Sequence, residues 1–182
     1  MNDNIEQLKY PIGKFNYAPG SDELSKAIER ISSLPGKLRS AVAGLSNVQL
    51  DTPYRDGGWT LRQVIHHIPD SHINAYTRFK LAITEDNPDI RPYDEGKWAE
   101  CEEAKHGNIQ LSLDLIDALH KRLVTFLRSL SADDLNRTYY HPANNKQSKL
   151  IEVVSMYAWH GDHHLAHITV AKEKFRRKPE SP

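Results

Sequence analysis

Apolar residues recur at intervals of three and four positions in four long segments of this chain. That spacing places side chains on one face of an α-helix, so it predicts four helices. Thr60 and Gln63 fit a capping box at the start of the second helix. Pro35-Gly36 is expected to interrupt or kink the first helix, and Pro69 to bend the second. The predicted helices span approximately residues 21–45, 60–83, 109–130 and 149–176.

Between these helices the chain is rich in turn-forming residues, and no segment shows a convincing strand pattern. Residues 1–20 are expected to form an extended arm, because two prolines and two glycines interrupt them. Loops are expected over residues 46–59, 87–92 and 131–148, the last with a helical turn near 132–135. We therefore predict an all-α four-helix bundle, a single domain over residues 1–182, with an extended N-terminal arm and long connecting loops.

The charge balance and the hydropathy pattern argue against several classes of function. Lysine plus arginine equals aspartate plus glutamate at 24 each, so no basic surface predicts binding to nucleic acid. The chain has no apolar run long enough to span a membrane and no signal peptide pattern, so a cytoplasmic protein is expected. The single cysteine, Cys101, excludes an internal disulfide, and the glutamates beside it disfavour a reactive thiolate.

Seven of the ten histidines lie in two short windows. In the later window, His160 and His164 are four residues apart and therefore stack on one face of a helix. On a helical wheel, His164 falls inside the apolar arc and His160 lies at its edge. His163 and His167 point instead toward solvent or a neighbouring element. We therefore predict that His160 and His164 are the buried pair, able to bind one metal ion through neutral imidazoles.

The earlier window, residues 66–72, does not identify a ligand by spacing alone. His72 lies on the apolar stripe of its helix, whereas His66 and His67 flank that stripe on opposite sides. Along one side of this helix, four polar residues recur at intervals of three and four. Such a row is either the lining of a site or a solvated face. Its members are His67, Ser71, Asn74 and Arg78.

Two histidines on one turn, with a third from a facing helix, would form a metal site with an open coordination position. Structural zinc sites usually have four protein ligands, often cysteines, and this chain has no cysteine cluster. An open site leaves room for water or a thiol, whose pKa a bound metal lowers. The alternative is that these histidines cap helices or satisfy hydrogen bonds in the core.

Two motifs stand far apart in the chain: Gly57-Gly58-Trp59-Thr60-Leu61-Arg62-Gln63-Val64-Ile65-His66-His67-Ile68 and His160-x-x-x-His164. Together they resemble the DinB-like superfamily, and within it the YfiT branch of metal-dependent hydrolases, also described as bacillithiol transferases. The combination is highly specific, whereas an HxxxH motif alone is weak. Further matching segments cover nearly the whole chain in order: residues 10–13, 50–60, 70–72, 78–80, 90–95, 140–142 and 159–168.

The resemblance implies a four-helix bundle that holds a divalent metal, zinc or nickel, on three histidines. Carried over by position, the ligands are His67, His160 and His164, of which the helical wheel selects only the last two. The resemblance also implies a cytoplasmic homodimer. Pro69 departs from the family pattern, which usually has a small helix-forming residue there, and a kink at this point could shift His67.

The leading hypothesis is a metal-dependent hydrolase of the DinB/YfiT type that uses the three histidines to activate water. One alternative is a bacillithiol-type S-transferase that activates a low-molecular-weight thiol for attack on electrophiles. A second alternative is a non-catalytic metal-binding stress protein. The two enzymatic hypotheses need the same histidines, so the sequence does not separate them. The expected partner is a small-molecule substrate, and nucleic acid and membranes are not expected partners.

Beyond the metal ligands, the candidate catalytic residues are His141, Arg78 and Asn74. His141 is either a general base near the site or a packed loop residue. Arg78 and Asn74 could bind polar groups of the substrate, although Arg78 could equally form a structural ion pair. Asp70 and Asp162 could orient a ligand imidazole, or they could be ordinary carboxylates on helix surfaces.

Overall fold

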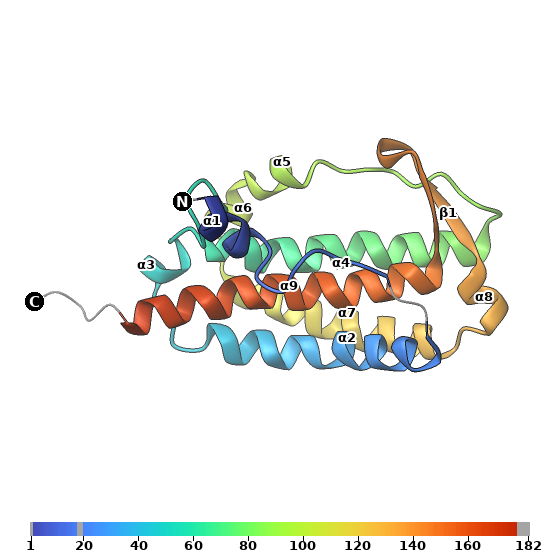
Figure 1. Cartoon of the computed structure of the whole chain (residues 1–182), viewed down its shortest axis with the longest axis horizontal. Coiled ribbons are helices and arrows are strands. Elements are labelled where there is room, and N and C mark those ends of the chain that lie inside the picture. The colour runs from blue at the N-terminus through green and yellow to red at the C-terminus, as the bar shows by residue number, and fades with distance from the viewer. Residues whose placement is uncertain (1, 18–19, 178–182) are drawn as a thin grey trace, which may run out of the picture.

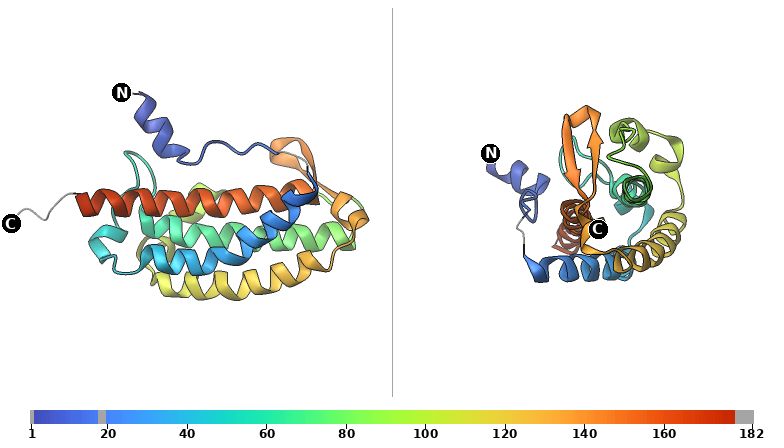
Figure 2. Two further views of the ribbon diagram at one scale, coloured as in Figure 1. Left: turned by 60° about the horizontal axis from the view of Figure 1, so that its bottom comes forward. Right: turned by 90° about the vertical axis from the view of Figure 1, so that its right-hand side faces the viewer.

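Four long helices lie side by side along the length of the molecule (Figure 1). They are α2 (Ser21–Val42), α4 (Leu61–Thr84), α7 (Ile109–Arg128) and α9 (Leu150–Arg177). The structure, a computed structural model, describes residues 2–17 and 20–177. Helix α2 packs against α7 and α9, and α4 packs against the same two helices, so α2 and α4 occupy opposite corners (Figure 2). The predicted four-helix bundle is confirmed.

The connecting segments contain more regular structure than the sequence predicts. Residues 2–9 form a helix, so the expected extended arm is wrong there and holds only for residues 10–17 and 20. Residues 1, 18 and 19 of the expected arm lie outside the described residues. The helical turn expected near 132–135 is confirmed. The short helices are α1 (Asn2–Lys9), α3 (Asn47–Leu50), α5 (Glu95–Ala99), α6 (Glu102–His106), α8 (Ala132–Asn136) and the 3-10 helix η1 (Pro142–Asn144).

A small antiparallel hairpin lies where no strand was expected, and this is a second correction. Strand β1 (Thr138–His141) pairs with β2 (Lys146–Lys149), and each strand has only four residues. Segments this short carry too little alternation to be recognised by their pattern. The hairpin is tied to the loop that follows α4, because the Tyr140 amide donates to the Pro88 carbonyl and the Ile90 amide donates to the Tyr140 carbonyl.

The helix signals in the sequence have the expected local structure, with one exception. The Thr60 hydroxyl accepts a hydrogen bond from the Gln63 amide at 3.1 Å, and Gln63 Oε1 accepts from the Thr60 amide at 2.9 Å. The capping box at the start of α4 is therefore confirmed. Pro35 and Pro69 lie inside α2 and α4 without ending either helix. Of the interruption or kink expected at Pro35, the interruption is therefore wrong, and the kink stays a prediction.

The apolar core forms two clusters, one on each side of a layer of buried histidines. Along α4 the change from one cluster to the other falls between Ile68 and Ala75, and along α9 it falls between Ala158 and Leu165. Buried polar side chains are costly unless they are hydrogen-bonded, so this layer is expected to be closely connected. Gly161 lies within it, where an added Cβ would collide with the Leu34 side chain, so α2 and α9 approach closely beside the histidines.

None of the described helices is both long and apolar enough to cross a membrane.

Candidate metal centre

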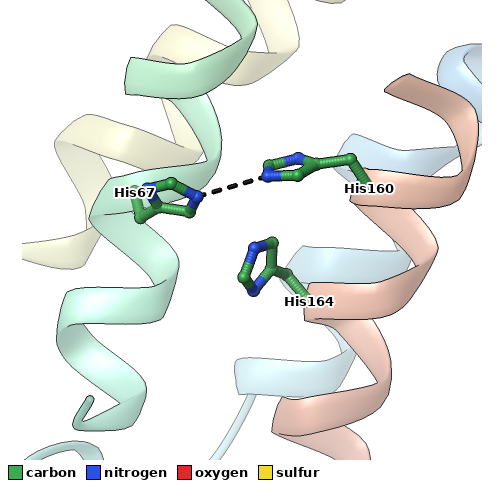
Figure 3. Close-up of side chains that lie close together, drawn as sticks. All are labelled: His67, His160 and His164. Carbon is green, nitrogen blue, oxygen red and sulfur yellow. Dashed lines mark hydrogen bonds between the residues drawn. The ribbon is translucent and has the colours of Figure 1, made fainter. Parts of the chain in front are cut away.

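Three imidazole rings from two helices converge in the middle of the bundle (Figure 3). His67 comes from α4, and His160 and His164 come from successive turns of α9. The Nε2 atoms of His67 and His160 are 3.2 Å apart, and each of the three rings offers a nitrogen within 4.8 Å of the others. The structure thus brings together the three residues that the family resemblance implies as ligands, and Pro69 has not displaced His67.

Burial keeps these imidazoles neutral. It lowers the pKa of His67 to about 4, with a smaller contribution from nearby His163. Burial also lowers the pKa values of His160 and His164 well below the usual range, and the neighbouring histidines lower them further. Near pH 7 all three rings therefore carry a lone pair, which is the form that binds a metal ion.

A chain of hydrogen bonds fixes which nitrogen of His160 carries its proton. The Ile31 carbonyl can only accept, so His120 Nδ1–H donates to it at 2.6 Å. His72 Nδ1–H then donates to His120 Nε2 at 2.9 Å, and His160 Nδ1–H donates to His72 Nε2 at 3.2 Å. Burial lowers the pKa of His120 to about 4 and that of His72 well below its usual range, so both are neutral and each has one donor and one acceptor nitrogen. His160 Nε2 is left unprotonated and faces the other two ligands.

A second, shorter chain acts on His164 in the same way. The Lys9 carbonyl at the end of α1 accepts from His167 Nε2–H at 3.2 Å. His164 Nδ1–H then donates to His167 Nδ1 at 3.4 Å. Burial lowers the pKa of His167 to about 4, so this ring is also neutral. His164 Nε2 is therefore the nitrogen with the free lone pair. Among the described residues, no comparable series of hydrogen bonds ends at His67.

The spacing of these nitrogens fits a metal ion with tetrahedral or similar coordination. Ligand bonds of roughly 2.0–2.1 Å at tetrahedral angles place two nitrogens about 3.3 Å apart. The observed separation between His67 and His160 is 3.2 Å. Lone pairs that face each other in a buried site repel unless a proton or a cation lies between them, so the donor set suits a cation. Three neutral nitrogens fit zinc, nickel or cobalt better than magnesium or calcium, which prefer oxygen.

A carboxylate lies close to one of the three imidazoles, that of His67. Glu95, the first residue of α5, has its Oε2 atom 3.9 Å from His67 Nε2. Its side chain is 65% exposed to solvent. Sequence reasoning missed Glu95, because it follows a turn-rich loop whose position relative to α4 cannot be known from spacing.

A cavity of about 650 Å³ opens beside His160. Residues 15–17, the loop before α5 and the hairpin contribute to its walls together with α4 and α9. Arg78 and His141 both line it, as expected for residues that could contact a substrate. Asn74 does not: it lines a neighbouring depression with Trp98, and its amide nitrogen donates to the Asp70 carbonyl at 2.8 Å.

A second group of three histidines lies on α9 alone. His163, His164 and His167 also offer nitrogens within 4.8 Å of one another. His163 and His167 were expected to face solvent or a neighbouring element and not to belong to the buried pair. Both are buried, so they face neighbouring elements, and their exclusion from the buried residues is wrong. The N-terminal segment and a loop cover them: Tyr10 packs near His163, and the Tyr54 ring stacks on His167 with centroids 4.0 Å apart. A helical wheel cannot detect a covering segment from elsewhere in the chain.

Two of the remaining candidates, His66 and Asp162, have structural partners. His66 Nδ1 lies 2.7 Å from the Ser112 hydroxyl of α7, so this histidine turns away from the metal centre. Asp162 forms an ion pair with Arg30 at 2.7 Å rather than a contact with a ligand imidazole. Burial raises the pKa of Asp70 to about 6. The groups that orient His160 and His164 are thus other histidines, and the sequence analysis had not considered His120 at all.

The chain is similar to known proteins over nearly its full length. The family model of the DinB superfamily matches residues 30–168. A protein of Bacillus mycoides named "Putative metal-dependent hydrolase" is 49% identical over 172 residues, 93% of this chain and 98% of the relative. A protein of Bacillus cereus with the same description is 49% identical over 96% of this chain and 98% of its own length. The structure of YfiT from Bacillus subtilis, described as "a probable metal-dependent hydrolase with an unusual four-helix bundle topology", superposes with a TM-score of 0.91. It is 42% identical and covers 93% of this chain and 98% of the YfiT chain.

Proposed function

Because this chain belongs to the DinB superfamily, we propose that it is a metal-dependent hydrolase that acts on a small molecule. One observation carries the proposal: His67, His160 and His164 converge beside a cavity that a small molecule could enter. Relatives that match almost the whole chain bear the name of metal-dependent hydrolases. A site with only three protein ligands leaves an open position, which is typical of catalytic rather than structural zinc centres.

The three histidines would hold a divalent cation, which we propose to be zinc or nickel. When bound, such a cation supplies a lowered pKa for a water molecule or thiol at its open position. The protein contributes the rest of the site. The hydrogen-bond chains hold the His160 and His164 rings with Nε2 unprotonated, and groups that orient ligand imidazoles in this way raise their basicity.

Glu95 is the proposed general base. Its Oε2 atom, 3.9 Å from His67 Nε2, is close enough to accept a proton from a water molecule held beside that ligand. It can then return this proton to the leaving group of the substrate. His141 lines the same cavity, and burial lowers its pKa, so it is neutral and can exchange hydrogen bonds with a substrate. Its Nδ1 atom is buried without a partner among the described residues.

The experiment begins with elemental analysis of untagged protein, followed by assays of p-nitrophenyl acetate hydrolysis. We expect about one metal ion per chain and turnover that a chelator removes and added zinc or nickel restores. His160→Ala should lose both metal and turnover. His106→Ala is the matched control, since this side chain is 70% exposed and lies outside the site. Wild-type protein that binds no metal, or turnover unaffected by His160→Ala, would contradict the proposal.

The same preparation tests the alternative nucleophile. The presence of Glu95 favours water over a thiol as the nucleophile, because a thiol that a metal has deprotonated needs no carboxylate base. A parallel assay combines a low-molecular-weight thiol, 2-mercaptoethanol, with 1-chloro-2,4-dinitrobenzene. If the metal-dependent protein consumes this electrophile faster than the ester, the function is that of a thiol S-transferase and not of a hydrolase. Metal binding without turnover in either assay would indicate a non-catalytic metal-binding protein.

A further inference from the structure

Arg78 is a buried cation whose hydrogen-bonding capacity is almost unused. Its residue is 8% exposed, and it lies on α4 in the wall of the cavity. A guanidinium has five N–H donors and stays charged at any relevant pH. The described residues offer it two tyrosine hydroxyls: Nη1 donates to the Tyr157 hydroxyl at 3.3 Å, and the Tyr139 hydroxyl lies within reach of the guanidinium. No carboxylate of the described residues lies within ion-pair distance of it.

A second buried arginine on the same helix shows how this fold satisfies such a group. Arg62 is 6% exposed, and all three of its side-chain nitrogens are engaged. Nε donates to Asp51 at 2.7 Å, Nη1 to the Gly107 carbonyl at 2.9 Å and Nη2 to Asn47 at 3.1 Å. Burial of a charge without such partners is costly. Arg78 therefore lacks the carboxylate partner and the full set of hydrogen-bond acceptors that the fold supplies to Arg62.

The surroundings of Arg78 direct its charge into the cavity. Tyr139 and Tyr157 are almost fully buried beside it and provide no negative charge. Burial lowers the pKa of His141, and the charge of Arg78 lowers it further, so the guanidinium acts on the groups that line this space. Glu95 and Glu152 also line the cavity, but neither forms an ion pair with Arg78. His160 lines the same cavity, and the centroid of its ring lies 5.8 Å from that of Tyr157.

We propose that Arg78 binds a carboxylate group of the substrate. This inference rests on the proposed function, because it takes the cavity beside the metal ligands to be the substrate site. A carboxylate matches the planar donor edge of a guanidinium, and one negative charge balances one buried positive charge. A phosphate dianion would need further buried cations, which the described lining does not provide. The substrate class is thus a small monocarboxylate whose reacting group lies toward His160 and whose carboxylate lies at Arg78.

Binding is tested in the metal-free full-length chain, because a carboxylate could otherwise bind the metal. The probes are butyrate and its neutral isostere butyramide, titrated while the protein is followed by two-dimensional NMR. Butyrate should bind more tightly than butyramide. Arg78→Met should weaken butyrate binding by about 10- to 100-fold, the effect of losing hydrogen bonds to a charged group. Arg78→Lys should recover part of the affinity. Arg122→Met, at an exposed residue outside the cavity, is the control and should bind butyrate as wild type does.

Stability separates recognition from a purely structural role. Arg78→Met removes a buried charge without a carboxylate partner, so the metal-free variant should resist urea at least as well as wild type. A marked loss of stability would overturn the proposal. So would equal affinity for butyrate and butyramide, unchanged butyrate binding by Arg78→Met, or tighter binding of inorganic phosphate than of butyrate. Metal content is measured separately in each variant. A chain that binds butyrate through Arg78 but holds no metal would refute the proposed function and leave this inference standing.

Discussion

The two groups of three histidines are alike in composition but differ in what their nitrogens can do. Both place three nitrogens within 4.8 Å of one another, and both include His164. In the first group, the hydrogen bonds leave Nε2 of His160 and His164 free and facing His67. In the second, both nitrogens of His167 are already engaged, by the Lys9 carbonyl and by His164. Proximity of imidazoles is therefore not sufficient to define a metal site.

The second difference is the origin of the ligands. The first group draws on α4 and α9, so its geometry is fixed by the packing of two long helices. It also faces a cavity and a nearby carboxylate, Glu95. The second group comes from α9 alone and is covered by the N-terminal segment. We infer that the second group supports the first, with His167 orienting His164, rather than forming a second metal site.

The largest expected effect comes from removing one member of each group in turn. His160→Ala takes away one of three ligands, so the metal content of purified protein should fall below detection. His163→Ala removes a ring that stacks on Trp159 and has no hydrogen-bond partner at Nδ1 among the described residues, so the metal content should stay at the wild-type level. Elemental analysis of the two variants checks the comparison. Loss of metal in His163→Ala with retention in His160→Ala would reverse the assignment of the two groups.

The next effect concerns the carboxylate that only the first group has. Glu95→Gln keeps the shape of the side chain but removes its ability to accept a proton. Turnover should fall by about 10²- to 10⁴-fold, the usual contribution of a general base. Metal content and the KM for p-nitrophenyl acetate should change little, because Glu95 is not one of the three ligands. If metal were lost together with turnover, Glu95 would be a fourth ligand and the site would be closed.

A smaller effect is expected where the hydrogen-bond chains are cut. His72→Phe leaves His160 Nδ1–H without an acceptor, and His167→Phe does the same to His164. Loss of groups that orient metal ligands typically lowers metal affinity by about 10- to 100-fold. Competition with a chromogenic chelator measures this affinity for each variant. His72→Gln, which retains an acceptor, should recover part of the loss. His106→Ala should match wild type, and equal affinities in all variants would show that the chains do not orient the ligands.

Helix periodicity predicted the framework of this site but not its connections. The pattern of apolar residues identified the four long helices, and spacing on α9 selected His160 and His164. His67 came only from the family resemblance, because it flanks the apolar stripe of α4 and spacing gave it no preference over His66. A contact between two helices depends on their relative rotation and height, which one sequence does not specify.

The features missed by sequence reasoning share one cause. His120 lies on the apolar stripe of α7, four residues after Ile116, and a lone histidine on such a stripe is a signal that could have been used. Glu95 and the covering of His163 and His167 depend on where loops and the N-terminal segment fold back over the bundle. Loop paths are set by tertiary packing, so neither periodicity nor composition reports them.

The smallest effect is a change in how acid destabilises the metal-free protein. His120 is 1% exposed, and burial lowers its pKa from 6.5 to about 4. Between these values the unfolded chain binds a proton that the folded chain does not. Its contribution to stability is therefore fully present above pH 6.5 and is lost as the pH falls toward 4. One such group changes the free energy of unfolding by up to ~1.4 kcal/mol per pH unit.

His120→Phe removes that proton, so the free energy of unfolding should fall less steeply with acid than in wild type. Urea unfolding of the metal-free protein at pH 7, 6 and 5 measures the slope, which is independent of any constant loss of stability caused by the substitution. His106→Ala, at a histidine that is 70% exposed, is the control substitution. The same slope in His120→Phe and wild type would mean that His120 takes up a proton as readily in the folded protein as in the unfolded chain. The chain that leads from Ile31 to His160 could then not hold His160 Nε2 free, and the first group would lose the feature that distinguishes it from the second.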